Sequence, residues 1–101
     1  MILATMCNQL TAVNLSPENL DFLLKTSVLE IKMSKFEQSK IRLKKIIKLN
    51  PNFDKAYYNL GLIYLNVDKD LDRSKLNFEA TLKLNPDYMK AKDMIRYIEN
   101  N

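Results

Sequence analysis

Four acidic side chains have the spacing of a calcium-binding loop. They occupy the first, third, fifth and twelfth positions of one window: Asp68, Asp70, Asp72 and Glu79. Such a loop also needs a glycine at its sixth position, where this chain has Arg73, and an apolar residue at its eighth, where it has Lys75. We therefore interpret the aspartates as the acidic start of a helix, where carboxylates meet the positive end of the helix dipole.

A second cluster is basic. Lys40, Lys44 and Lys48 recur every four residues, with Arg42 and Lys45 beside them. Residues 1–50 contain eight Lys or Arg and four Asp or Glu, whereas residues 51–101 contain eight of each, so the net charge of +4 belongs to the first half. A basic stripe suits nucleic acid or an acidic partner. Because aromatic residues for base stacking do not interleave with it, we interpret it as a solvated helix face and do not expect nucleic acid.

Catalytic groups are scarce. The chain has no histidine and one cysteine, Cys7, so it lacks the commonest general base and cannot form an internal disulfide or a cysteine metal cluster. It has no glycine-rich phosphate loop and no nucleophile–base motif. We predict a protein that is not an enzyme, with no catalytic, cofactor-binding or metal-binding residues.

Targeting signals are also missing. No apolar run approaches the roughly 18 residues of a membrane span, and the apolar start lacks a basic leader. We expect no membrane segment, and we interpret the glycosylation sequon at Asn14 as accidental. A chain without disulfides fits a reducing compartment, so we expect a cytoplasmic, intracellular protein.

The elements that position these side chains are predicted to be helices. One glycine and three prolines in 101 residues leave too few turn residues for a many-stranded sheet. Apolar residues recur at helical spacing in six segments: 2–14, 18–33, 36–49, 54–66, 71–84 and 87–99. Pro17, Pro51 and Pro86 break the pattern 34 and 35 residues apart, a period typical of arrays of helix pairs.

Within that period the residues resemble a tetratricopeptide (TPR) repeat. The segment from Pro51 to Pro86 has the large aromatic, Leu-Gly pair, second aromatic, small residue and third aromatic of the family: Tyr57, Leu60, Gly61, Tyr64, Ser74 and Phe78. Thr81 replaces the usual alanine. The resemblance implies an all-α, right-handed superhelix of antiparallel helix pairs, with about six helices. Small residues at 61 and 74 would let two helices approach closely.

The resemblance divides the chain into a single domain, 1–101. Residues 1–15 resemble the trailing helix of a partial repeat, 17–50 and 51–85 two repeats, and 86–101 a capping helix with Ala91 aligned to Ala56. The first repeat departs from the family pattern at Thr26, which replaces leucine, and at Glu30, which replaces an aromatic. On packing grounds Gly61→Leu should destabilise the second repeat, whereas Gly61→Ala should be near neutral because alanine favours helix.

First helices of TPR proteins line a concave groove that binds extended peptides or helices of partners. Carried onto this sequence, that groove comprises Leu24, Val28, Ile31, Lys55, Tyr58, Asn59, Leu62, Leu65, Asn66, Lys90, Asp93, Met94 and Tyr97. Some family members clamp a chaperone C-terminal carboxylate at five positions. Here Asn59 and Lys90 match, while Leu24, Val28 and Met94 do not.

Three functions follow as alternatives. The first is a non-enzymatic scaffold that binds a protein or peptide partner in the groove. The second is a basic helical adaptor for nucleic acid or acidic surfaces. The third is a structural accessory subunit of a larger complex. Self-association through the terminal helices is compatible with each.

Overall fold

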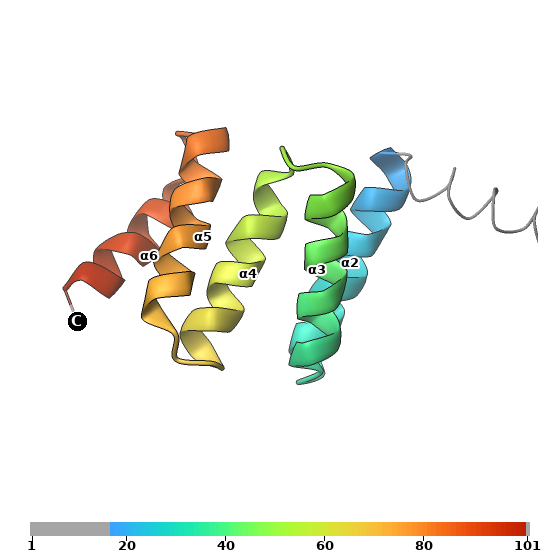
Figure 1. The fold of residues 1–101 in the computed structure, drawn as a ribbon, viewed down its shortest axis with the longest axis horizontal. Coiled ribbons are helices and arrows are strands. Elements are labelled where there is room, and N and C mark those ends of the chain that lie inside the picture. The colour runs from blue at the N-terminus through green and yellow to red at the C-terminus, as the bar shows by residue number, and fades with distance from the viewer. Residues whose placement is uncertain (1–16, 101) are drawn as a thin grey trace, which may run out of the picture.

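The computed structural model describes residues 17–100, which form five helices and no strand (Figure 1). The helices are α2 (Pro17–Lys32), α3 (Phe36–Leu49), α4 (Asp54–Asn66), α5 (Leu71–Leu84) and α6 (Met89–Glu99). The predicted all-α architecture is confirmed, and the predicted bounds of these five helices hold to within two residues. The predicted helix 2–14 lies outside the described residues.

The helices form an elongated row in which each packs on the next, with extents of 57 × 28 × 18 Å. Figure 1 shows consecutive helices joined by short turns and running in opposite directions, from α2 at one end to α6 at the other. This is the arrangement expected when no helix pair buries its own apolar face and each must stack on its neighbour. The right-handed superhelical coil stays a prediction.

The Asn-Pro pairs make two matching turns between helices. Asn50 and Asn85 leave the helix with extended backbone angles, as expected for a residue before proline. Each donates its backbone N–H to the carbonyl four residues earlier. Each side-chain oxygen accepts from the backbone N–H two residues later, at 3.1 Å in both turns. The recurring prolines therefore mark a recurring turn geometry.

The turns inside each helix pair also match. Ser34 and Lys69, which lie 35 residues apart, both have positive φ, 62° and 56°. After the second turn, the Asp70 carboxylate accepts from the Arg73 backbone N–H at 3.1 Å and caps α5. Asp70 therefore has the helix-start role that the sequence predicted for this acidic cluster. Among residues 17–100, no group of three or more acidic, histidine or cysteine side chains is placed to hold a metal ion.

A serine hydroxyl joins the two helices of each repeat. Ser74 on α5 donates to the Gly61 carbonyl on α4 at 2.8 Å. Ser39 on α3 donates to the Ser27 carbonyl on α2 at 2.9 Å. All three serines are fully buried. Bonds of this kind at equivalent positions require the two backbones to approach closely, which only small residues permit.

The approach at Gly61 leaves no room for a side chain. A Cβ added at residue 61 would lie 2.7 to 2.9 Å from three ring atoms of Phe78, and that ring is fully buried. In the first repeat the small residue is larger and its neighbour is smaller. Ser27 stands where the second repeat has Gly61, and Leu43 stands where it has Phe78. The near-neutral outcome expected from sequence for Gly61→Ala therefore does not fit the packing around Phe78.

A buried ion pair accounts for the departure at residue 30. Glu30 occupies the position of Tyr64 in the second repeat, and its carboxylate binds Arg42 of α3 through contacts of 2.8 and 3.2 Å. The hydrogen bonds from Arg42 lower the pKa of Glu30, which keeps the carboxylate ionised although it is buried. In the second repeat, Tyr64 instead lies beneath two cations, Lys40 and Arg73, at 5.5 and 6.0 Å from its ring centroid.

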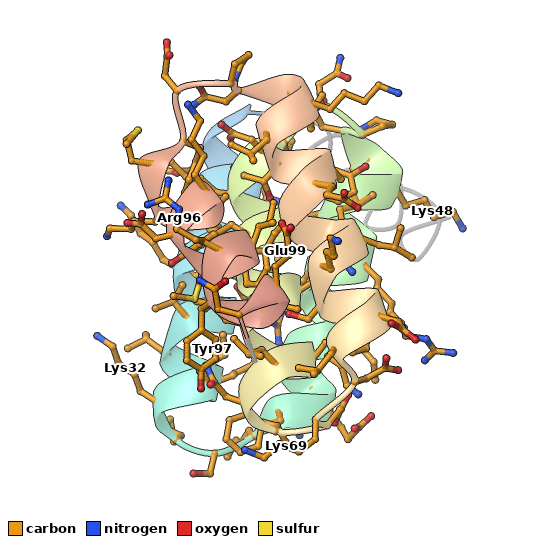
Figure 2. All side chains as sticks on the ribbon, turned by 90° about the vertical axis from the view of Figure 1, so that its left-hand side faces the viewer. Lys32, Lys48, Lys69, Arg96, Tyr97 and Glu99 are labelled. Atoms are coloured by element: carbon orange, nitrogen blue, oxygen red, sulfur yellow. The ribbon has the colours of Figure 1, made fainter. Side chains whose placement is uncertain are left out.

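Helix α6 has charged residues at the positions that correspond to the α4 residues in contact with α5. The α4 positions that contact α5, Gly61 and Tyr64, correspond 35 residues later to Arg96 and Glu99. Figure 2 looks onto this end of the row and shows both side chains on the surface of α6. A polar outer face is what a terminal helix of an array needs. The capping role of residues 86–101 stays a prediction.

We predict that Gly61→Ala lowers the free energy of unfolding by about 1–3 kcal/mol, because the added methyl displaces a buried ring. This cost outweighs the gain in helix propensity, which is about 1 kcal/mol. Urea denaturation followed by circular dichroism measures the change. The matched control is the same substitution in a Phe78→Leu background, which resembles the first repeat. There Gly61→Ala should be neutral or stabilising. An equal loss in both backgrounds would contradict the Phe78 contact.

We predict that Glu30→Gln lowers the free energy of unfolding at pH 7 by roughly 1–3 kcal/mol, because it removes the charge that Arg42 binds. Since the folded-state pKa of Glu30 is lowered, its contribution is present above the ordinary carboxyl pKa and disappears as pH falls through the folded value. The gap between wild type and variant should therefore be full above the ordinary carboxyl pKa of about 4 and narrow as the pH falls below it. Glu37→Gln, which alters an exposed pair with Lys40, is the control and should change stability by less than about 1 kcal/mol. A gap that stays constant as the pH falls below about 4 would assign the effect to the shape of the side chain instead of its charge.

Candidate functional site

A hollow of about 330 Å³ opens between α4 and α6. It is lined by two tyrosines, three apolar side chains, an amide and a lysine: Tyr58, Tyr97, Leu62, Leu65, Met94, Asn66 and Lys69. Six of these belong to the groove predicted from sequence, and Lys69 does not. Rings and apolar side chains with a few polar groups at the rim are the usual lining of a binding site for a peptide side chain.

A second hollow, of about 250 Å³, adjoins the first. It shares Leu62 and Asn66 with the first hollow. Its other lining residues are apolar: Ile31, Phe36, Ile63 and Val67. The shared residues make the two hollows neighbours along α4. Together they give an apolar trough on one side of the row, running from the α2–α3 turn to α6.

Tyr58 belongs partly to the core and partly to the trough. Its ring centroid lies 5.6 Å from that of Phe78 on α5 and 5.0 Å from that of Tyr88, just before α6. The sequence pattern places Tyr58 off the apolar stripe of Ala56, Leu60 and Ile63, which suggests that the fold does not need it. The structure differs, because α6 brings Tyr88 against its ring.

Burial of the Tyr58 phenol raises its pKa, and the nearby Asp93 carboxylate raises it further. Burial likewise raises the pKa of Tyr88, with added effects of Tyr58 and Asp54. Both hydroxyls therefore stay protonated at neutral pH and can donate hydrogen bonds. In the lining of the first hollow, the Tyr58 hydroxyl is thus an uncharged hydrogen-bond donor close to the Asp93 carboxylate.

The remaining predicted groove residues differ in how much surface they offer. Leu24 is buried in the core and Val28 is half-buried, so α2 contributes little to the trough through them. Lys55 and Lys90 are exposed. The Asn59 amide donates to the Lys55 carbonyl of its own helix at 2.8 Å. None of these five residues lines either hollow, and a binding role for them stays a prediction.

The sequence analysis does not predict Lys69 as a groove residue, because the position of Lys69 depends on the turn conformation and not on the period of a helix. It lies between α4 and α5 in the left-handed backbone conformation, which sets it beside Asn66 at the rim of the first hollow. The one signal in the sequence is the extra residue that makes the second period 35 instead of 34. In Figure 2, Lys69 of the α4–α5 turn lies below Tyr97 of α6, which lines the same hollow, and Lys48 extends from the opposite side of the molecule.

Comparison with known families gives a match to the middle of the array. Residues 43–75, which run from the second half of α3 to the start of α5, match the family model for the tetratricopeptide repeat. These residues are therefore similar to a tetratricopeptide repeat, as the sequence pattern predicted. A search of curated proteins finds no match to it. TPR arrays are typically protein-interaction modules, so the match supports an interaction or scaffold role in general terms. No helix within residues 17–100 is long and apolar enough to cross a membrane.

The TPR arrangement also places the basic stripe of the sequence. Lys40 is drawn into ion pairs, at 2.7 Å from Asp68 and 3.1 Å from Glu37, and the hydrogen bond to Asp68 raises its pKa. Arg42 is engaged by Glu30. Lys44, Lys45 and Lys48 are exposed on α3, away from the trough. Two of the five basic groups thus serve the packing of the repeats.

We predict that Tyr58→Ala lowers the free energy of unfolding by roughly 2–3 kcal/mol, because Phe78 and Tyr88 each lose a ring neighbour. Tyr97→Ala should cost less than about 1 kcal/mol, because Tyr97 is 55% exposed. Thermal unfolding of both variants followed by circular dichroism makes the comparison. Equal losses would show that Tyr58 is not used by the core.

Proposed function

We propose that this TPR module binds a peptide or a helix of a partner protein along the trough formed by α4 and α6. The observation that supports it most directly is the hollow between Tyr58, Leu62, Met94 and Tyr97, whose size suits one large apolar side chain. Tyr97 is mostly exposed, so a bound side chain would remove aromatic area from water. The neighbouring hollow at Ile31 and Phe36 would take a second apolar side chain of the same ligand.

The polar rim would orient such a ligand. The Tyr58 phenol, the Asn66 amide and the Lys69 ammonium are donors beside apolar walls, and peptide carbonyls are acceptors. Aromatic anchors surrounded by such donors are the usual hot spots of protein interfaces. We therefore propose a non-enzymatic scaffold role with an apolar-anchored peptide as ligand.

The basic-adaptor alternative is supported less well. It relies on a continuous stripe along α3, yet Lys40 and Arg42 are held by acidic partners within the fold. The three exposed lysines lie on a second helix, where their field is screened by salt. They remain the natural comparison set for any test of the trough.

The experiment selects peptides from a random display library on the intact chain and measures their affinities for three variants. Tyr97→Ala and Leu62→Ser alter the trough, and a triple variant with Glu at 44, 45 and 48 alters the basic face. Lys40 is left unchanged because its ion pairs support the fold. We expect at least about tenfold weaker binding for each trough variant and little change for the triple variant.

Circular dichroism first confirms that each variant keeps its helix content and melting behaviour. Loss of binding in the triple variant alone would replace the trough with the basic face as the binding surface. Peptides that bind all three variants equally would place the site elsewhere. Concentration-dependent sedimentation of the unmodified chain would point to self-association through the terminal helices.

A further inference from the structure

The apolar trough continues into a third hollow at the α2–α3 turn. This hollow, of about 480 Å³, shares Phe36 and Val67 with the second hollow. Its other lining residues are polar: Ser34, Lys35, Glu37 and Gln38. Figure 1 shows that the α2–α3 and α4–α5 turns lie along the same edge of the row, at the bottom of the view. The trough therefore borders an edge made of these two turns, residues 32–37 and 66–70, which we call the turn edge.

Three lysines lie at the turn edge. Lys35 lines the third hollow, and Lys69 lines the first. Lys32 ends α2 at the position 34 residues before Asn66, which lines both hollows of the trough. In Figure 2, Lys32 extends from the side of the molecule opposite to Lys48, so it does not belong to the basic face of α3. All three ammonium groups are on exposed side chains and can reach a ligand in the trough.

These lysines have no counterion within the described part of the chain. None of the ion pairs formed within residues 17–100 involves them. The carboxylates nearest to them in the sequence are held by other cations: Glu30 by Arg42, Glu37 and Asp68 by Lys40, and Asp70 by Arg73. The fold thus neutralises the acidic groups of the turn edge and leaves the lysines beside an apolar wall.

The carboxylate of Asp93 lies at the other end of the first hollow. It is close enough to Tyr58 to raise the pKa of that phenol. Tyr58 precedes Asn66 by eight residues, which is about two turns of α4. A carboxylate that a ligand places at the turn edge is therefore well separated from Asp93. Charge complementarity at this edge favours an acidic ligand.

We propose that the trough takes an acidic segment of a partner protein, in which large apolar side chains are flanked by glutamate or aspartate. The apolar side chains occupy the first two hollows, and the carboxylates pair with Lys32, Lys35 and Lys69. This inference rests on the proposed function, because it names the chemistry of the ligand at that same trough. A carboxylate is a stronger partner for an ammonium group than a peptide carbonyl is. The hollows anchor the ligand, and the turn edge selects it by charge.

The test begins with peptides selected from a random display library on the intact chain. One selected acidic peptide is compared with its analogue, in which glutamine and asparagine replace glutamate and aspartate. Fluorescence anisotropy measures both peptides on wild type and on two variants that lose the same charge. The turn-edge variant combines Lys32→Gln, Lys35→Gln and Lys69→Gln. The control variant combines three exposed positions of α3: Lys44→Gln, Lys45→Gln and Lys48→Gln.

We expect the library to enrich acidic residues next to apolar ones, and wild type to bind the acidic peptide about tenfold more tightly than its analogue. The turn-edge variant should bind the two peptides about equally, whereas the control variant should keep the preference. Raising the salt concentration from about 50 mM to about 500 mM should reduce the preference, because these charges are exposed. Tyr97→Ala should weaken both peptides alike. Circular dichroism first confirms that each variant keeps its helix content.

The other outcomes separate this inference from the proposed function. Peptides that are weakened by Tyr97→Ala but show no preference for carboxylates overturn the acidic ligand and leave the trough as the binding site. Peptides that Tyr97→Ala does not weaken overturn both. A preference that both triple variants lose equally assigns it to the net charge of the chain, and overturns the turn edge. Binding of a single-stranded RNA that requires the turn-edge lysines and displaces the peptide replaces the acidic segment with nucleic acid.

Discussion

The close approach of paired helices at Gly61 and Ser27 is the constraint on which the rest of the fold depends. In each pair a buried serine on the second helix donates to a carbonyl on the first, at 2.8 and 2.9 Å. The bond is possible only where the first helix presents a residue small enough to bring the backbones together. Volume is conserved across the pair, since glycine meets phenylalanine in one repeat and serine stands with leucine in the other.

This approach divides each first helix into faces with separate roles. In α4, one face meets α5 at Gly61 and another meets α3 through Ala56 and Ile63, which leaves a third face toward the trough. Tyr58 stands at the border, with its ring against Phe78 and Tyr88 and its edge in the hollow. A ligand in the trough would therefore touch a residue that also stabilises the fold, so binding and stability are coupled at that ring.

The helices at the two ends of the row differ in the polarity of their outer faces. An open end of a stacked array exposes the face that the next element would have covered. Helix α6 carries Arg96 and Glu99 at the positions of Gly61 and Tyr64, so its outer face interacts well with water. Helix α2 carries Phe22, Leu29 and Met33, which do not. The outer face of α6 is thus charged, whereas the outer side of α2 exposes apolar side chains.

The sequence by itself determined the helices, their bounds and the repeat period, because each depends on local patterns of apolar spacing and on the Asn-Pro turns. It also showed the resemblance to a TPR repeat through Leu60, Gly61 and Ser74, which lie within the residues 43–75 that match the family model. Only the tertiary structure decided the partners of charged and aromatic side chains. Glu30 departs from the family pattern in the sequence, and in the structure it forms an ion pair with Arg42. Lys40 belongs to the basic stripe in the sequence, and in the structure it forms an ion pair with Asp68. Tyr58 packs against Tyr88. These contacts link residues 12 to 30 positions apart, and such distances are set by how helices pack and not by the period of any one helix.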